Sequence, residues 1–178
     1  MKSRPSRLFF HLNLAQMIGG TTMKLTTFTD CSLRVLIYLA TAPQRRATSA
    51  EIAAAFDISE HHLTKVVHHL GKSGWLANIR GKGGGLTLAM PAAAIVVGKV
   101  VRDTEKVIAP AECFETDGTD CCIERICRLR GVLGEAIVAF YAVLDRYTLA
   151  DLVHNDAALA RVMFIAPAAQ HAPARRAP

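Results

Sequence analysis

The fold is decided by residues 59–89, which read SEHHLTKVVHHLGKSGWLANIRGKGGGLTLA. Ser59 is one of the residue types that cap the N-terminus of a helix, and apolar side chains then recur at the spacing of one helix face. These apolar residues are Leu63, Val66, Val67 and Leu70. Gly71 and Gly74 supply the signal that commonly ends a helix. The first half of the stretch is therefore predicted to be a helix with one buried face.

A β-hairpin is predicted directly after this helix. Two strand-like runs, residues 75–79 and 86–89, flank the glycine-rich and basic sequence RGKGGG at residues 80–85. Short strands joined by such a loop are typical of a hairpin with a flexible, positively charged tip.

Two more helices are predicted upstream of the deciding stretch. The first carries Leu33, Leu36, Ile37 and Ala40 at helical spacing and ends near Pro43. The second is capped by Thr48 or Ser49 and carries Ile52, Ala53 and Phe56. Three helices followed by a hairpin make a winged helix-turn-helix. The expected fold class is therefore mainly α, with a small β-hairpin wing.

The second half of the chain is predicted to hold a cysteine loop and a long dimerisation helix. A short helix around residues 97–105 leads into an irregular, acidic stretch at 107–122, and a long helix then runs from about residue 123 to 147. Its apolar residues Leu133, Ile137, Phe140, Leu144 and Tyr147 step 4, 3, 4, 3 along the chain, as in a coiled coil. This pattern favours a homodimer, and the alternative is a helix packed in its own chain.

Charge is distributed unevenly over the 178 residues, whose net charge is +6. Residues 1–22 carry +3, residues 23–100 carry +5, residues 101–165 carry −4 and residues 166–178 carry +2. A basic first half joined to an acidic second half suggests a polyanion-binding module coupled to a second function. No uncharged run reaches the roughly 18 apolar residues that a membrane-spanning helix needs. A transmembrane protein is therefore excluded, and no membrane partner is expected.

The chain divides into four predicted segments. Residues 1–22 are expected to be a disordered leader or an over-long start, with an export signal as the alternative. Residues 23–92 form the winged-helix DNA-binding domain, and residues 93–165 form the cysteine loop and dimerisation region. The proline-containing residues 166–178 are expected to be a disordered tail.

The helix that begins at Ser59 is the expected DNA reader. In a helix-turn-helix, the second helix lies in the major groove and its N-terminal residues contact base edges. The residues expected to contact DNA are Ser59, His61, His62, Thr64 and Lys65, with His68, His69 and Lys72 also on the solvent side. Arg80 and Lys82 at the wing tip are expected to enter the adjacent minor groove. The alternative is that these polar residues only contact solvent and do not bind DNA.

The histidines of this helix are not expected to bind a metal. His61, His62, His68 and His69 lack the i, i+4 spacing that lets two imidazoles share an ion on a helix.

Four of the five cysteines lie within fifteen residues: Cys113, Cys121, Cys122 and Cys127. Zinc sites usually arrange cysteines in pairs two to four residues apart, whereas here seven residues separate Cys113 from Cys121 and five separate Cys121 from Cys127. A loop of thiolates entering a helix can instead surround an iron–sulfur cluster. The spacing favours a cluster and leaves zinc or redox-active thiols as alternatives.

Several segments together resemble the NsrR nitric-oxide-sensitive repressors, which belong to the Rrf-type family of bacterial winged-helix regulators. The resemblance covers about residues 23–165. It rests on MKLTTFTD at residues 23–30, the wing RGKGGG, Glu112-Cys113, CRLR at residues 127–130 and YTLADL at residues 147–152. The wing and the helix-turn-helix identify only the broad family. The cysteine spacing and YTLADL point to the NsrR branch.

This resemblance implies a homodimer that binds double-stranded operator DNA and holds one [2Fe-2S] or [4Fe-4S] cluster per subunit. Cys113, Cys121 and Cys127 fall on the three cysteine ligands of the family. Asp30 falls on the aspartate that completes the site from the partner subunit in some members. Cys122 could substitute for Cys121, and Cys31 could compete for the fourth position, but both are expected to be passive.

The expected function is that of a cytoplasmic repressor, not an enzyme, which releases its operator when nitric oxide attacks the cluster. One alternative is a sibling regulator that senses iron or cluster supply with the same fold. A thiol-redox or electron-transfer protein is a further alternative, although the sequence shows no nucleotide fingerprint and no nucleophile–base pair.

Overall fold

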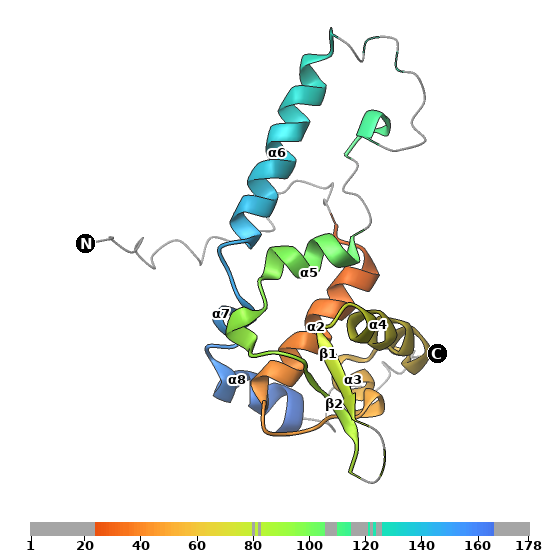
Figure 1. Cartoon of the computed structure of the whole chain (residues 1–178), viewed down its shortest axis with the longest axis vertical. Helices are drawn as coiled ribbons and strands as arrows, with labels where there is room; N and C mark the ends of the chain where they lie inside the picture. The colour runs from red at the N-terminus through yellow and green to blue at the C-terminus, as the bar shows by residue number, and fades with distance from the viewer. Residues whose placement is uncertain are drawn as a thin grey trace, which may run out of the picture.

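A computed structural model describes residues 24–79, 81, 83–105, 110–114, 121, 123 and 126–165 (Figure 1). The elements of the first part are α2 (Thr27–Thr41), α3 (Ser49–Phe56), α4 (Glu60–Lys72), β1 (Leu76–Ile79), β2 (Gly85–Leu88) and η1 (Ala92–Ala94). Those of the second part are α5 (Val97–Thr104), η2 (Glu112–Phe114), α6 (Arg128–Leu144), α7 (Leu149–Leu152), α8 (Asp156–Ala160) and η4 (Arg161–Ile165). The winged helix-turn-helix predicted from the sequence is confirmed.

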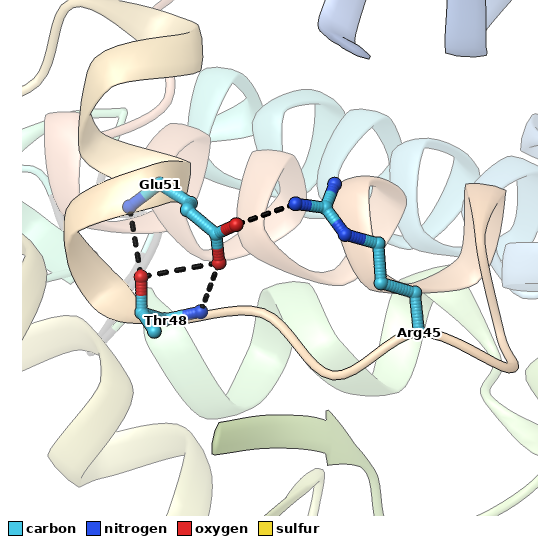
Figure 2. A network of polar contacts seen from close by, with 3 residues as sticks. All are labelled: Arg45, Thr48 and Glu51. Carbon is cyan, nitrogen blue, oxygen red and sulfur yellow. Dashed lines mark hydrogen bonds and ion pairs between the residues drawn. The ribbon is translucent and has the colours of Figure 1, made fainter. Parts of the chain in front are cut away.

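Side-chain caps set where the first three helices begin. The hydroxyl of Thr26 accepts a hydrogen bond from Thr29 N at the start of α2, and that of Ser59 accepts from His62 N at the start of α4. At α3 the cap is Thr48 and not Ser49, because Thr48 and Glu51 form a reciprocal capping box (Figure 2). Glu51 also pairs with Arg45, which fixes the turn that precedes α3 (Figure 2).

The wing is an antiparallel hairpin in which Leu76 pairs with Leu88 and Ile79 with Gly85. The turn before α3 lies against its second strand, since Ala47 and Leu86 exchange two backbone hydrogen bonds of 3.2 and 2.7 Å. Nη1 of Arg46 donates to the carbonyl of Gly83 at 2.7 Å. The hairpin is therefore held at its strand and at its tip by the segment between α2 and α3.

One hydrophobic core serves both halves of the chain. Its buried members from the winged helix are centred on α2 and α4 and include Leu36, Ile52, Leu63 and Leu70. Ile95 and Val100 from around α5, and Leu149 and Val153 from around α7, belong to the same cluster. The core therefore crosses the boundary predicted between residues 92 and 93, and the chain after α6 returns to pack against α2.

Two short backbone segments form a clasp at the base of α5 and α6. Val97 N donates to Tyr147 O at 2.9 Å, and Leu149 N donates to Ile95 O at 2.8 Å. These bonds flank an isolated antiparallel bridge between Val96 and Thr148. The start of α5 and the end of α6 are therefore held together at the same place.

The long helix differs from its prediction in length. It spans Arg128–Leu144, with Cys127 as its N-cap and Asp145 as its C-cap, and not residues 123–147. The apolar residues continue at the same spacing beyond the helix, since Ile126 lies before its start and Tyr147 after its end. Helix α6 projects from the rest of the fold, and its first turn is the end farther from α7 and α8 (Figure 1).

None of the helices among the described residues is both long enough and apolar enough to cross a membrane.

Candidate functional site

The exposed face of α4 carries three of the residues predicted to contact DNA. His61, Thr64 and Lys65 are exposed. The hydroxyl of Thr64 donates a hydrogen bond to Glu60 O at 2.8 Å within the helix. The hydroxyl of the exposed Ser59 accepts a hydrogen bond from His62 N and so caps the helix. Both hydroxyls keep capacity for a further hydrogen bond. The polar groups of His61 and Lys65 are exposed on the helix, as a base-reading or phosphate-binding side chain must be.

The prediction that His62 and His69 face solvent is wrong. Both are half-buried, and their Nε2 atoms are inaccessible to solvent. Their rings meet Phe28 of α2 edge-on, with centroid distances of 6.4 Å for His62 and 5.3 Å for His69. The cause is helical geometry, because residues 62, 66 and 69 lie on one stripe and Val66 is fully buried. His62 is therefore available to DNA only from its less buried edge.

The wing contributes a second part of the predicted DNA surface. Gly81 and Gly83 have positive φ values of 95° and 78°, the backbone conformation that glycine adopts without strain. Arg80 and Lys82, the two residues predicted to enter the minor groove, lie outside the described residues. The hairpin that would present them is present.

A polar contact that sequence reasoning missed joins α4 and the wing to α5. Oδ2 of Asp103 accepts a hydrogen bond from Nε1 of Trp75 at 2.8 Å and lies 3.2 Å from Nε2 of His69. Asp103 is more than thirty residues away from His69 in sequence, and no local spacing signals such a contact.

The predicted cluster ligands occupy the segment between α5 and α6. Cys113 on η2 and Cys127 at the N-cap of α6 are half-buried, Cys121 is exposed, and all three are free thiols. Cys122 lies outside the described residues. Within the part of the chain that the structure describes, no three His, Cys, Asp or Glu side chains come close enough together to hold a metal ion. The donor set nevertheless suits iron, because three free cysteines share one segment and iron–sulfur clusters are held by cysteine sulfur.

A cation–π contact brings two of these cysteines to one region. The guanidinium carbon of Arg130, in the first turn of α6, lies 5.9 Å from the centre of the Phe114 ring. Phe114 is adjacent to Cys113, and Arg130 is three residues after Cys127. The contact therefore places η2 beside the start of α6.

Asp30 and Cys31 differ sharply in what they offer a metal. Asp30 is in the first turn of α2, its side chain is 48% exposed, and Oδ2 pairs with Nη2 of Arg34 at 2.7 Å. Cys31 is 3% exposed and belongs to the core. Burial, followed by the charge of Asp30, raises the pKa of the Cys31 thiol and so opposes the thiolate that would bind iron. Asp30 can therefore reach another molecule, whereas Cys31 cannot without leaving the core.

A buried carboxylate ties the end of α5 to the start of α2. Glu105, which is 7% exposed, accepts hydrogen bonds at Oε1 from Thr26 N at 2.6 Å and from Thr26 Oγ1 at 3.1 Å. Thr26 is the N-cap of α2, whose first turn carries Asp30. The cysteine segment therefore starts directly beside the helix that carries the predicted fourth ligand.

Helix α6 is held to α5 by a forked ion pair. Nη1 and Nη2 of Arg102 each lie 2.7 Å from an oxygen of Asp145, and the Arg102 guanidinium also stacks 4.3 Å from the centre of the Tyr141 ring. Hydrogen bonding to Arg102 lowers the pKa of the Asp145 carboxyl. Gly98 permits this approach, since a Cβ there would lie 2.1 Å from Oδ1 of Asp145.

The remainder of α6 exposes apolar side chains. None of its residues is buried. Leu129, Val132 and Val143 are 62%, 60% and 44% exposed, and with Ala136 and Ala139 they repeat at steps of 3, 4, 3, 4. The predicted seam of Leu133, Ile137, Phe140 and Leu144 is half-buried and lies beside this stripe. An exposed apolar stripe is therefore displaced by one residue from the predicted seam.

Comparison with known proteins places these features in one family. Residues 25–155 match the Rrf2 family, described as an iron-dependent transcriptional regulator. The HTH-type transcriptional regulator NsrR of Geobacillus kaustophilus is 49% identical over 138 residues, which cover 77% of this chain and 94% of the relative. NsrR of Bacillus subtilis is 48% identical over 134 residues, which cover 75% of this chain and 92% of the relative.

Solved structures agree with the fold. CymR, the global cysteine regulator of B. subtilis, matches with a TM-score of 0.54 and 30% identity over 75% of this chain and 98% of its own. IscR of T. potens matches with a TM-score of 0.60 and 24% identity over 75% of this chain and 88% of its own, which is a likeness of fold. The relatives are regulators, so the expectation that the chain is not an enzyme is confirmed. The chain belongs to the Rrf2 family of transcriptional regulators and is an NsrR-like member of it.

Proposed function

We propose that the protein is a dimeric repressor that binds operator DNA through α4 and the wing, and that it senses nitric oxide through an iron–sulfur cluster. The observation that carries the proposal is the position of the three free thiols. Cys113, Cys121 and Cys127 lie on the one segment that joins the winged-helix core to the exposed helix α6.

The DNA-binding part of the proposal is supported by the fold and by exposed donors. The exposed His61 and Lys65 of α4 are the proposed major-groove contacts. Arg80 and Lys82, which lie outside the described residues, are the proposed minor-groove contacts. A cytoplasmic location is part of the proposal, because an operator-binding protein must reach the chromosome.

The sensing part of the proposal assigns Cys113, Cys121 and Cys127 as cluster ligands, with Asp30 as a fourth ligand offered to the partner subunit. When bound, the cluster supplies iron that reacts with nitric oxide. A carboxylate is a hard and weak ligand for such iron, so the bond from Asp30 would be the most easily broken of the four. To serve there, the Asp30 carboxylate must share or leave its ion pair with Arg34.

The three cysteines would tie three points of one segment together. While the thiolates are held, η2 and the start of α6 keep one arrangement relative to α5. When they are released, the segment loses those ties, and α5 and α6 are free to shift against each other. Because a dimer reads two half-sites at a fixed spacing, a small shift of this kind weakens operator binding.

Dimerisation is proposed through the exposed stripe of α6. A contiguous apolar surface of this kind is rarely left open to water in a folded protein. A second copy of the same stripe, related by a two-fold axis, provides a self-complementary cover for it.

The test is a gel shift with anaerobically purified, cluster-loaded protein before and after a stoichiometric nitric oxide donor. We expect tight operator binding before the donor and loss of binding after it. Loss of binding on iron removal without a response to the donor would instead support the sibling function of sensing iron or cluster supply, which the iron-dependent description of the family favours. Bound zinc and no iron would contradict both.

A further inference from the structure

The last turn of α5 contacts three other elements through three side chains. Arg102 pairs with Asp145 after α6, Asp103 contacts His69 of α4 and Trp75 before β1, and Glu105 holds the N-cap of α2. The cysteine segment begins immediately afterwards, at residue 106. A displacement at the start of that segment therefore acts on a helical turn already bonded to the DNA-reading elements.

Asp103 makes the contact that reaches the recognition helix and the wing together. A single oxygen, Oδ2, accepts from the Trp75 indole and faces Nε2 of His69. The imidazole lies close enough for an ion pair when it is protonated, and the indole N–H points to the same carboxylate. Asp103 of α5 therefore meets both the residue before β1, through the hydrogen bond from Trp75, and α4, through the close approach of His69.

His69 is also contacted by the first turn of α2. The ring of Phe28 in the first turn of α2 packs 5.3 Å from the His69 ring. Phe28 lies between Thr26, which Glu105 holds, and Asp30, the proposed fourth ligand. The last turn of α5, which leads into the cysteine segment, and the first turn of α2, which carries Asp30, thus both contact the same histidine of α4.

We propose that Asp103 is a positioning residue that carries the placement of α5 to the recognition helix and the wing, so that operator affinity depends on the state of the cysteine segment. The proposal rests on the proposed function, because it assumes a cluster on that segment. Asp103 itself touches neither the DNA nor the ligands.

The experiment compares operator affinity of the full chain with and without its cluster. The variants are Asp103→Ala, which removes both contacts, and Asp103→Asn, which keeps an acceptor for the indole but loses the charge facing His69. Glu135→Gln is the matched control, since it removes one carboxylate charge from an exposed position of α6. Iron content and sedimentation are measured for each protein.

We expect the ratio of loaded to cluster-free affinity to be large in the wild type, within the range of about 5- to 150-fold that is common for coupled sites. In Asp103→Ala it should fall to near 1 with unchanged iron content, and Asp103→Asn should lie between. The control should keep the wild-type ratio.

The chain's single tryptophan provides a second readout that needs no DNA. Trp75 loses its acceptor in Asp103→Ala, so the indole N–H turns to water and its emission moves to longer wavelength. Removal of the cluster should move the wild-type emission in the same direction and leave that of Asp103→Ala unchanged.

The outcomes separate the two proposals. A wild-type ratio that persists undiminished in both Asp103 variants, with the same emission shift on cluster loss, would overturn the role of Asp103 and leave the sensor standing. A wild type whose affinity does not depend on the cluster would overturn the proposed function and the coupling with it. If Asp103→Ala does not fold, Asp103→Asn decides by the same criteria.

Discussion

Glu105 shows how much one carboxylate does at the residue scale. Its two hydrogen bonds to Thr26 are the described polar contacts between the end of α5 and the cap of α2. We expect Glu105→Ala to lower the free energy of unfolding by roughly 1–2 kcal/mol, because hydrogen bonds to a charged acceptor are lost and Thr26 is partly open to water. Glu105→Gln keeps an acceptor oxygen and should cost less. Urea unfolding followed by circular dichroism measures both, and equal losses would show that the acceptor is not what matters.

The cysteines give a second prediction at this scale. Replacing Cys113, Cys121 or Cys127 individually by Ser should abolish the visible absorbance and the bound iron of protein purified without oxygen, since each loss opens the ligand set. Cys122→Ser and Cys31→Ala should retain both. Cys31→Ala should instead lower stability by about 1 kcal/mol, because it removes a buried side chain from the core. Loss of absorbance in Cys122→Ser with retention in Cys121→Ser would reverse the assignment within the adjacent pair.

At the scale of the element, the capping box of α3 is predicted to make stability depend on pH. The backbone hydrogen bond from Thr48, then its hydroxyl and Arg45, lower the pKa of Glu51 below its ordinary value of 4.5. A carboxyl with a lowered pKa stabilises the fold above its unfolded-state pKa, and this stability disappears as the pH falls through the lowered value. Glu51→Gln should therefore melt at a lower temperature than the wild type at pH 7. The difference should shrink as the pH falls from 4.5 through the lowered pKa of Glu51, and a difference that stays constant over that range would count against the box.

The recognition helix yields a prediction about salt. Lys65 is exposed on α4 and faces away from the core. Lys65→Ala should weaken operator binding and reduce the salt slope by about one counterion for each half-site. Arg146→Ala, which removes an exposed charge after α6, is the control and should leave the slope unchanged. An unaltered slope in Lys65→Ala would show that this face of α4 does not contact phosphate.

Local elements could be predicted from the sequence, and contacts between them could not. The caps at Thr48 and Ser59, the core positions of α4 and the wing depend on neighbours a few residues away, and the predicted bounds agree closely with those observed. The packing of His62 and His69 on Phe28 and the contact of Asp103 join elements distant in sequence. Helical spacing places such side chains on a stripe but does not say which other element covers it. The ligand roles of the cysteines remain predictions that spacing and family resemblance support.

At the scale of the whole molecule, the exposed stripe of α6 predicts which substitutions dissociate the proposed dimer. Val132→Asp should convert the dimer to a monomer in sedimentation, because a charge would be buried in an apolar interface. Val138→Asp is a matched control, as Val138 is 69% exposed against 60% for Val132 and lies on another face of the helix. If the dimer survives Val132→Asp but not Ile137→Asp, the pairing face is the seam predicted from the sequence.

The clasp between residues 95–97 and 147–149 makes α6 a lever with a fulcrum at one end. The helix has 17 residues and is therefore about 25 Å long. Its C-terminus lies next to the clasp, while Cys127 is at the opposite end. A shift of about 2 Å at Cys127 thus amounts to a tilt of only about 5° at the fulcrum, given the length of the helix. A movement at Cys127 would therefore act at the far end of the helix, on the turn where Asp145 pairs with Arg102 of α5.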